Sequence, residues 1–233
     1  MIPISDDNPA RLRPYVTWGV IILCVVAFFW QLTFTEAAEE QVIEAYGFIP
    51  ANLFETPFEL RIYGIPWAWL TLISSLFLHG GFLHLGGNML YLWIFGNNVE
   101  DAMGHGRFVL FYFACGVVAA LAQGVGEPHS TVPVVGASGA ISGVLGSYVM
   151  IFPRAQVNVV IPLGIFFYPV KISAMYVIGF WFLLQLINVL GTSTGPVATA
   201  WAAHIGGFIL GIALTPLLSH FPLFGRRPPG PWS

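Results

Sequence analysis

The chain has 233 residues, of which 57% are hydrophobic and 8% are charged. Soluble domains carry about 25% charged residues, so this composition excludes an ordinary soluble domain and indicates a polytopic membrane protein built as one bundle. A net charge of −3 and the absence of any Lys/Arg-rich block argue against a nucleic-acid partner.

Long apolar stretches predict six membrane-spanning helices, at about residues 15–34, 82–102, 107–125, 138–152, 172–190 and 197–219. The first stretch follows Arg11 and Arg13 and is long enough to cross about 30 Å of hydrocarbon, so we expect an uncleaved first helix. Pro153 ends the fourth helix, and Pro196 stands where the sixth can begin. The predicted fold is therefore all-α, a six-helix membrane bundle.

The basic residues indicate the orientation of this bundle. With six crossings, seven of the eight Lys and Arg residues fall on one side, and only Arg61 lies opposite. The positive-inside rule then predicts that both termini are cytoplasmic. We expect a cytoplasmic N-terminal segment (1–14), the membrane domain (15–222) and a disordered tail (223–233), an organisation that fits a bacterial inner membrane.

The long first loop, about residues 35–81, faces outward in this topology. Its second half is rich in Trp, Leu and Phe, so we expect it to lie in the membrane interface or partly within the bilayer. A seventh crossing is the alternative. However, residues 66–78 are only 13 residues, against the roughly 20 that a spanning helix needs.

Two polar residues, 66 positions apart, lie within apolar segments that are predicted to span the membrane. Ser138 opens the short fourth helix, and His204 lies near the start of the sixth. The fourth helix is only about 22 Å long, which recesses Ser138 below the outer surface, and His204 lies about 12 Å into its own helix. We expect both side chains at a similar depth, where a histidine in reach of a serine forms a base and its nucleophile.

Glycines surround both positions. Gly136 and Gly139 flank the serine, where they permit a sharp turn into the helix and leave its hydroxyl and the first helical amides uncrowded. Gly139-x-x-x-Gly143 and Gly207-x-x-x-Gly211 are motifs that let helices pack closely in lipid. Because such motifs are common in membrane bundles, ordinary helix packing is the favoured interpretation when the motifs are taken alone.

A second polar cluster opens the predicted second helix. His84 and Asn88 are four residues apart on one face, and both can donate hydrogen bonds to an oxygen anion. His79 precedes the helix and is expected to brace the loop. Two histidines five residues apart share no helix face and have no carboxylate beside them, so we expect no metal. Hydrogen bonding between helices is the alternative role.

Further polar and sulfur-bearing residues have simpler interpretations. Glu100 and Asp101, at the inner end of the second helix, are expected to be solvated or tied to the next loop. Cys24 and Cys115 lie in apolar runs and are expected to be buried thiols rather than a disulfide. No helix core carries an aspartate, which excludes an aspartyl intramembrane protease.

Together and in this order, the motifs resemble those of the rhomboid family of intramembrane serine proteases, over roughly residues 13–222. The motifs are Gly136-Ala-Ser-Gly139, Ala203-His-Ile-Gly206, His79-x-x-x-x-His84-x-x-x-Asn88 and the Asn-Val-Glu-Asp run at 98–101. The resemblance implies a cofactor-free Ser–His dyad in a cavity open to the outer face. Ser138 would be the nucleophile, His204 the base, and His84 and Asn88, with the serine amide, the oxyanion donors. It also implies that the substrates are transmembrane proteins and that the enzyme binds them within the lipid bilayer.

Two positions depart from the family pattern. Many relatives have an aromatic residue four positions after the nucleophile, where this chain has Ser142, and many have a Trp-Arg pair where this chain has Trp69-Leu70. The resemblance therefore leaves open what orients His204 and how the first loop is anchored. The alternative functions are a non-catalytic rhomboid-like protein that binds membrane helices and a transporter. The intact serine and histidine argue against the first, and the gathering of polar residues near the outer side argues against the second.

Overall fold

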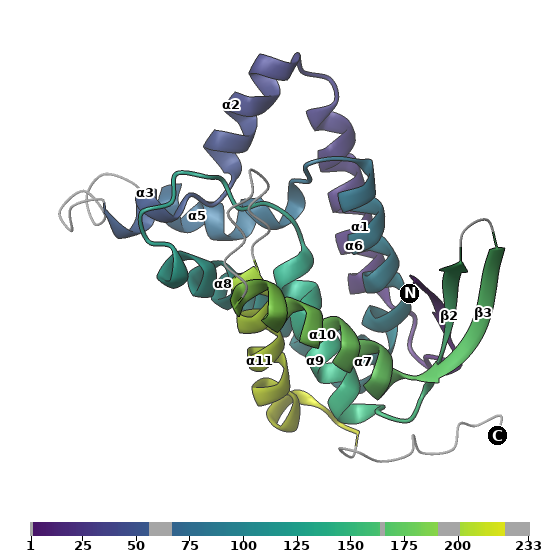
Figure 1. Cartoon of the computed structure of the whole chain (residues 1–233). Helices are drawn as coiled ribbons and strands as arrows, with labels where there is room; N and C mark the ends of the chain where they lie inside the picture. The colour runs from purple at the N-terminus through teal and green to yellow at the C-terminus, as the bar shows by residue number, and fades with distance from the viewer. Residues whose placement is uncertain (1, 56–66, 164–165, 191–200, 222–233) are drawn as a thin grey trace.

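The computed structural model describes residues 2–55, 67–163, 166–190 and 201–221 of the chain, and they form a mostly helical bundle with one small sheet (Figure 1). The helices are α1 (Tyr15–Gln31), α2 (Glu36–Tyr46), α3 (Pro50–Phe54), α5 (Trp67–Ser74), η1 (Ser75–Phe77), α6 (Phe82–Tyr91), η2 (Leu92–Gly96), α7 (Asn97–Met103), α8 (His105–Gly126), α9 (Ser138–Ile151), α10 (Ala174–Leu190) and α11 (Trp201–Leu218). The strands are β1 (Ile2–Asp6), β2 (Gln156–Leu163) and β3 (Phe166–Ser173).

The predicted apolar helices correspond to α1, the continuous α6–η2–α7 segment, α8, α9, α10 and α11. Among the described residues, α8 and α11 are long and apolar enough to cross a membrane alone. The segments Trp67–Phe77 and Phe82–Met103, which meet at 83°, pass the same test only as a bent pair. The helices α1, α9 and α10 are apolar but shorter. The predicted start of the sixth helix, at 197, and the tail 223–233 lie outside the described residues.

The short helix α9 lies at the centre of the bundle. Every residue from Gly139 to Tyr148 is buried, as expected of a helix that is apolar all round. α11 packs against α9 at glycines, where an added Cβ at Gly207 would overlap the Gly139 carbonyl oxygen and one at Gly211 the Gly143 carbonyl oxygen. The crossing of α9 and α11 therefore leaves no room for a side chain at Gly207 or Gly211.

The apolar half of the first loop forms α5 and η1, which turn by 83° into α6. The Trp67 indole nitrogen donates to the Ala45 carbonyl over 2.7 Å, and the Ser74 hydroxyl donates to the Tyr46 carbonyl over 2.7 Å. The rings of Tyr46 and Trp67 lie 5.6 Å apart. These contacts with the end of α2 anchor the loop in the absence of a Trp-Arg pair.

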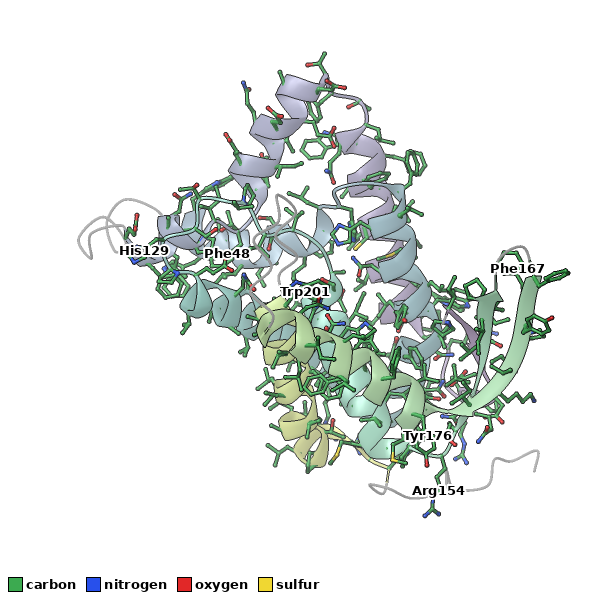
Figure 2. All side chains as sticks on the ribbon, viewed as in Figure 1. Phe48, His129, Arg154, Phe167, Tyr176 and Trp201 are labelled. Carbon is green, nitrogen blue, oxygen red and sulfur yellow. The ribbon has the colours of Figure 1, made fainter. Side chains whose placement is uncertain are left out.

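The three-stranded sheet is a feature that the sequence did not predict. β2 pairs antiparallel with both β1 and β3, and the hairpin extends to the side of the helices (Figure 1). The side chains of Val157 and Val159 are fully buried in the core of the bundle, whereas Phe167, toward the far end of the hairpin, is 67% exposed and points away from it (Figure 2). Apolar alternation over 156–163 is a strand signal that a search for membrane-length helices overlooks.

The N-terminal segment, expected only as a cytoplasmic extension, is part of this packed structure. The Asp6 carboxylate accepts hydrogen bonds from the Tyr148 hydroxyl over 2.5 Å and from the Asn98 side chain over 2.9 Å. Tyr148 is fully buried in α9. β1 is thereby attached to the C-terminal end of the central helix.

Of the two expectations for Glu100 and Asp101, solvation was wrong because both side chains are buried, whereas a tie to the following segment is present at Glu100. The Glu100 side chain is fully buried and accepts hydrogen bonds from the Val16 amide over 3.0 Å and the Thr17 amide over 2.8 Å. Asp101 accepts two backbone amides from the segment that precedes α1. The first amides of a helix lack intrahelical partners and carry its positive dipole end, so the Glu100 carboxylate caps α1, while Asp101 holds the segment that leads into it. His105, 2.6 Å from Glu100, adds the tie to the next helix.

Candidate active site

The serine and the histidine that the sequence analysis singled out are in contact. Ser138 Oγ lies 2.8 Å from His204 Nε2, a hydrogen-bond distance, and both residues are half-buried. Ser138 is the first residue of α9, and His204 lies in the first turn of α11. The close packing of these two helices brings the side chains together. In Figure 2, Trp201 marks the start of α11 near the middle of the molecule.

Gly136 shapes the turn into α9. Its φ of 118° is a backbone conformation that favours glycine, and its amide donates to the Ser75 carbonyl over 2.8 Å. A Cβ at this position would stand 2.7 Å from His84 Nε2 and 3.5 Å from Asn88 Nδ2. The absence of a side chain therefore lets both α6 side chains approach the backbone just before Ser138.

His84 and Asn88 direct nitrogen donors toward this region. The Gly80 amide donates to His84 Nδ1 over 3.3 Å, so the neutral ring carries its proton on Nε2, the nitrogen that faces the Gly136 backbone. Asn88 is 8% exposed, and its Nδ2 has no hydrogen-bond partner among the described residues. A buried donor without a partner costs about 1–3 kcal/mol, so a ligand that accepts a bond from it would recover that energy.

His79 lies beside this pair without lining the cavity. Its side chain is fully buried, and its ring centre is 5.1 Å from that of His84. Its backbone amide donates to the Gln31 side chain over 3.0 Å, and the Gln31 amide group donates back to the His79 carbonyl over 3.1 Å. This reciprocal pair holds the loop before α6 against the end of α1.

The surroundings of His204 come from α10 and α11. Its Nδ1 lies 2.8 Å from Oε1 of Gln185, and the Gln185 Nε2 donates to the Trp181 carbonyl over 3.0 Å. The Trp181 and Trp201 rings lie 5.9 Å and 6.0 Å from the imidazole. Ser142, which stands where many relatives have an aromatic residue, bonds instead to the Ser138 carbonyl over 2.6 Å.

Gln185 is a site residue that the sequence analysis missed. An amide within the apolar run Trp-Phe-Leu-Leu-Gln-Leu-Ile could have indicated a functional role, since polar groups in membrane helices commonly face the bundle interior. Its partner on another helix could not be read from the sequence.

A cavity of about 550 Å³ contains Ser138 and His204 in its wall. His84 and Asn88 contribute the other polar side chains, and the apolar part of the wall consists of Leu83, Tyr91, Ile141, Leu145 and Trp181 with the loop 133–135. This volume is typical of ligand sites, which combine apolar walls with a few convergent polar groups. Within the residues that the structure describes, no group of three His, Cys, Asp or Glu side chains could hold a metal ion.

Comparisons with known proteins point in the same direction as this geometry. The sequence model of the rhomboid domain matches residues 66–221, which is more than half of the chain. The chain is similar to the rhomboid protease GluP of Bacillus subtilis, 44% identical over 79 residues that cover 34% of this chain and 15% of GluP. It is also similar to the mitochondrial rhomboid protein 1 of Saccharomyces cerevisiae, 31% identical over 148 residues that cover 61% of this chain and 40% of the yeast protein.

Similarity to the rhomboid protease AarA of Providencia stuartii extends further along the chain. The two are 27% identical over 231 residues, which cover 91% of this chain and 76% of AarA. The chain thus spans less than half the length of the Bacillus and yeast relatives and about three quarters of the length of AarA.

Proposed function

The chain belongs to the rhomboid family, and on that premise we propose that it is a serine endopeptidase that cleaves other proteins within or near their transmembrane segments. Ser138 is the nucleophile and His204 the general base in this proposal. The observation that carries it is the 2.8 Å contact between Ser138 Oγ and His204 Nε2 in the wall of the cavity. A nucleophile within hydrogen-bond distance of a base is the arrangement that activates a serine.

Catalysis then follows from the atoms that line the cavity. His204 Nε2 takes the proton from Ser138 Oγ while the oxygen attacks the carbonyl carbon of the scissile bond. The imidazolium returns that proton to the leaving amine as the tetrahedral intermediate collapses to an acyl-enzyme. Water, deprotonated by His204 in turn, hydrolyses the ester and regenerates the serine.

The negative charge of the intermediate needs donors placed before the reaction begins. The Nε2 hydrogen of His84 and the unpartnered Nδ2 of Asn88 support this role, because both lie beside the backbone at Gly136, just before Ser138. The first amides of α9 support it too, because the first amides of a helix lack intrahelical partners. Each such donor typically contributes a factor of about 10²–10³ in rate.

The apolar wall of the cavity supports a membrane-embedded substrate. Leu83 and Tyr91 of α6 and Trp181 of α10 line it together, so we propose that a substrate helix enters laterally between α6 and α10. A peptide bond within a helix is shielded from attack, so the substrate must unwind locally. Gly and Pro lower the cost of unwinding, whereas Ala near the bond serves only by being small.

The distribution of charge supports an orientation for this integral membrane protein. Arg154 follows the inner end of α9 and points away from the bundle, at the opposite end of that helix from Ser138 (Figure 2). Because six crossings would put seven of the eight basic residues of the sequence on that side, we propose that both termini are cytoplasmic, that the cavity opens to the outer face, and that the membrane is a bacterial inner membrane.

The experiment that tests this function is labelling of purified protein with a fluorophosphonate, followed by mass-spectrometric identification of the modified residue. We expect modification of Ser138, loss of labelling in Ser138→Ala and His204→Ala, and loss of cleavage of a transmembrane reporter in proteoliposomes in both variants. Labelling of Ser142 instead, or full reporter cleavage by either variant, would refute the assignment. Absence of any labelling of the wild type would favour a non-catalytic rhomboid-like protein that binds membrane helices.

A further inference from the structure

We propose that Gln185 is a positioning residue that fixes the proton of the His204 imidazole on Nδ1 and thereby leaves Nε2 free to act as the base. The inference rests on the proposed function, because it assigns a role beside the same serine and histidine. Gln185 is 5% exposed, and its Oε1 lies 2.8 Å from His204 Nδ1.

The orientation of the Gln185 amide is determined by its own helix. Its second polar atom lies 3.0 Å from the Trp181 carbonyl oxygen, one turn earlier in α10. A carbonyl oxygen can only accept a hydrogen bond, so the atom that faces it must be the NH₂ group. The atom that faces His204 is therefore the amide oxygen, whatever the protonation of the ring.

That oxygen selects one tautomer of the imidazole. Because Oε1 only accepts, Nδ1 of His204 must carry the hydrogen, and Nε2 of the neutral ring is then a bare acceptor. Nε2 is the nitrogen 2.8 Å from Ser138 Oγ. The hydroxyl donates to it and can transfer its proton. In the opposite tautomer, Nε2 would already be protonated and could not take the serine proton.

The aromatic neighbours of His204 cannot make this selection. Trp181 and Trp201 lie 5.9 Å and 6.0 Å from the imidazole centre and restrict the plane in which it lies. Ring packing does not distinguish one nitrogen from the other, whereas a hydrogen-bond acceptor at Nδ1 does.

A neutral amide suits this position better than the carboxylate of a serine-protease triad. Gln185 lies on a helix whose other face exposes Phe180, Leu183 and Leu184, and a charge in such surroundings costs at least a few kcal/mol. The amide oxygen accepts the Nδ1 hydrogen in both the neutral and the protonated ring. It therefore orients His204 through the whole catalytic cycle without a buried charge.

The test compares two replacements of Gln185 with a matched control on the same helix. Gln185→Met keeps the length of the side chain and removes the acceptor, whereas Gln185→Glu keeps an acceptor and adds a charge. Asn188→Leu is the control, because Asn188 makes the same kind of bond, to the Leu184 carbonyl over 2.7 Å, whereas the hydrogen bonds of His204 go to Gln185 and Ser138. For each protein, kcat and KM would be measured on a transmembrane reporter across a pH series.

We expect Gln185→Met to lower kcat by about 10-fold to 100-fold, the effect known for removing a partner that orients a metal-binding histidine, with KM changed by less than about twofold. Gln185→Glu should recover part of the rate and move the acidic limb of the pH–rate profile to higher pH, because a carboxylate beside the ring stabilises the imidazolium. Asn188→Leu should match the wild type. A wild-type kcat and pH profile in both Gln185 variants would overturn the proposal.

A second measurement separates this proposal from the proposed function. In protein labelled with ¹⁵N-histidine, the His204 signals, assigned by their loss in His204→Ala, should show hydrogen on Nδ1 in the wild type and a shift toward the other tautomer in Gln185→Met. An unchanged tautomer in Gln185→Met overturns the positioning role even if the rate falls. If the wild type neither cleaves the reporter nor reacts with the fluorophosphonate, the proposed function fails. The spectra would still show whether Gln185 determines the tautomer of the His204 imidazole.

Discussion

The contact between Ser138 and His204 depends on glycine at the crossing of α9 and α11, so Gly207→Ala should impair cleavage without touching a reacting group. An added Cβ at Gly207 would overlap the carbonyl oxygen of Gly139 and lie 3.0 Å from its carbonyl carbon. Both neighbours are backbone atoms of a buried helix and cannot rotate away. The helices must therefore separate locally by about 1 Å before the methyl group fits, since protein interiors are close-packed.

The magnitude follows from the position of Gly139, the residue directly after Ser138. Overpacking of this kind costs about 1–3 kcal/mol of stability. A displacement of about 1 Å between reacting groups lowers the rate by about 100-fold. We therefore expect Gly207→Ala to lower kcat by about two orders of magnitude and to lower the free energy of unfolding by no more than about 3 kcal/mol.

The assay pairs reporter cleavage in proteoliposomes with SDS-induced unfolding of the purified protein in micelles. Gly19→Ala in α1 is the matched control, because a Cβ there meets nothing within 4 Å. It should keep the wild-type rate and be neutral or slightly stabilising, as Gly→Ala is in a helix interior. If Gly207→Ala retains both the wild-type rate and the wild-type stability, the reasoning that helix proximity aligns the two side chains is refuted.

Three further changes test other parts of the structure. Asn88→Ala removes a buried donor that has no partner, so cleavage should slow by about 10-fold or more, while SDS-induced unfolding should be unchanged; parallel losses of rate and stability would make Asn88 a packing residue. Glu100→Gln removes the charge that caps α1 and should lower the free energy of unfolding in the same titration by about 1–2 kcal/mol; an unchanged unfolding curve would contradict the capping role. Tyr148→Phe removes the hydroxyl that donates to Asp6 and should expose β1 to limited proteolysis; unchanged cleavage of the N-terminal segment would show that this bond does not hold the strand.

The sequence predicted the parts of the fold that depend on local composition. Apolar length located α1, α8, α9 and α10 within a few residues, because burying polar groups in hydrocarbon is costly enough to be visible in a single segment. Ser138 and His204 stood out for the same reason. A similar depth for the two could be predicted because a helix rises by about 1.5 Å per residue, although the start assumed for the sixth helix, at 197, lies outside the described residues.

Features that depend on contacts between residues far apart in the chain could not be predicted from local composition. Glu100 reads as a solvated residue at a helix end, and only the fold shows that its partners are backbone amides 83 and 84 residues earlier in the chain. The strands β2 and β3 were missed because they pair with each other and with the distant β1, and the search considered only apolar segments of membrane-spanning length. Gln185 was visible as an amide, but not as the partner of His204.

The polar side chains of the site share a property that explains its dependence on packing. Of the described residues that line the cavity, none carries a formal charge when histidine is neutral. Hydrogen bonds between neutral side chains in membranes contribute only about 1 kcal/mol each, too little to draw two helices together against a steric mismatch. The alignment of Ser138 with His204 must therefore come from the glycine contacts of α9 and α11, and the hydrogen bonds then select the tautomer and the rotamer within that alignment. This order of causes predicts that packing variants at the helix crossing affect the rate at least as strongly as the loss of the Gln185 bond.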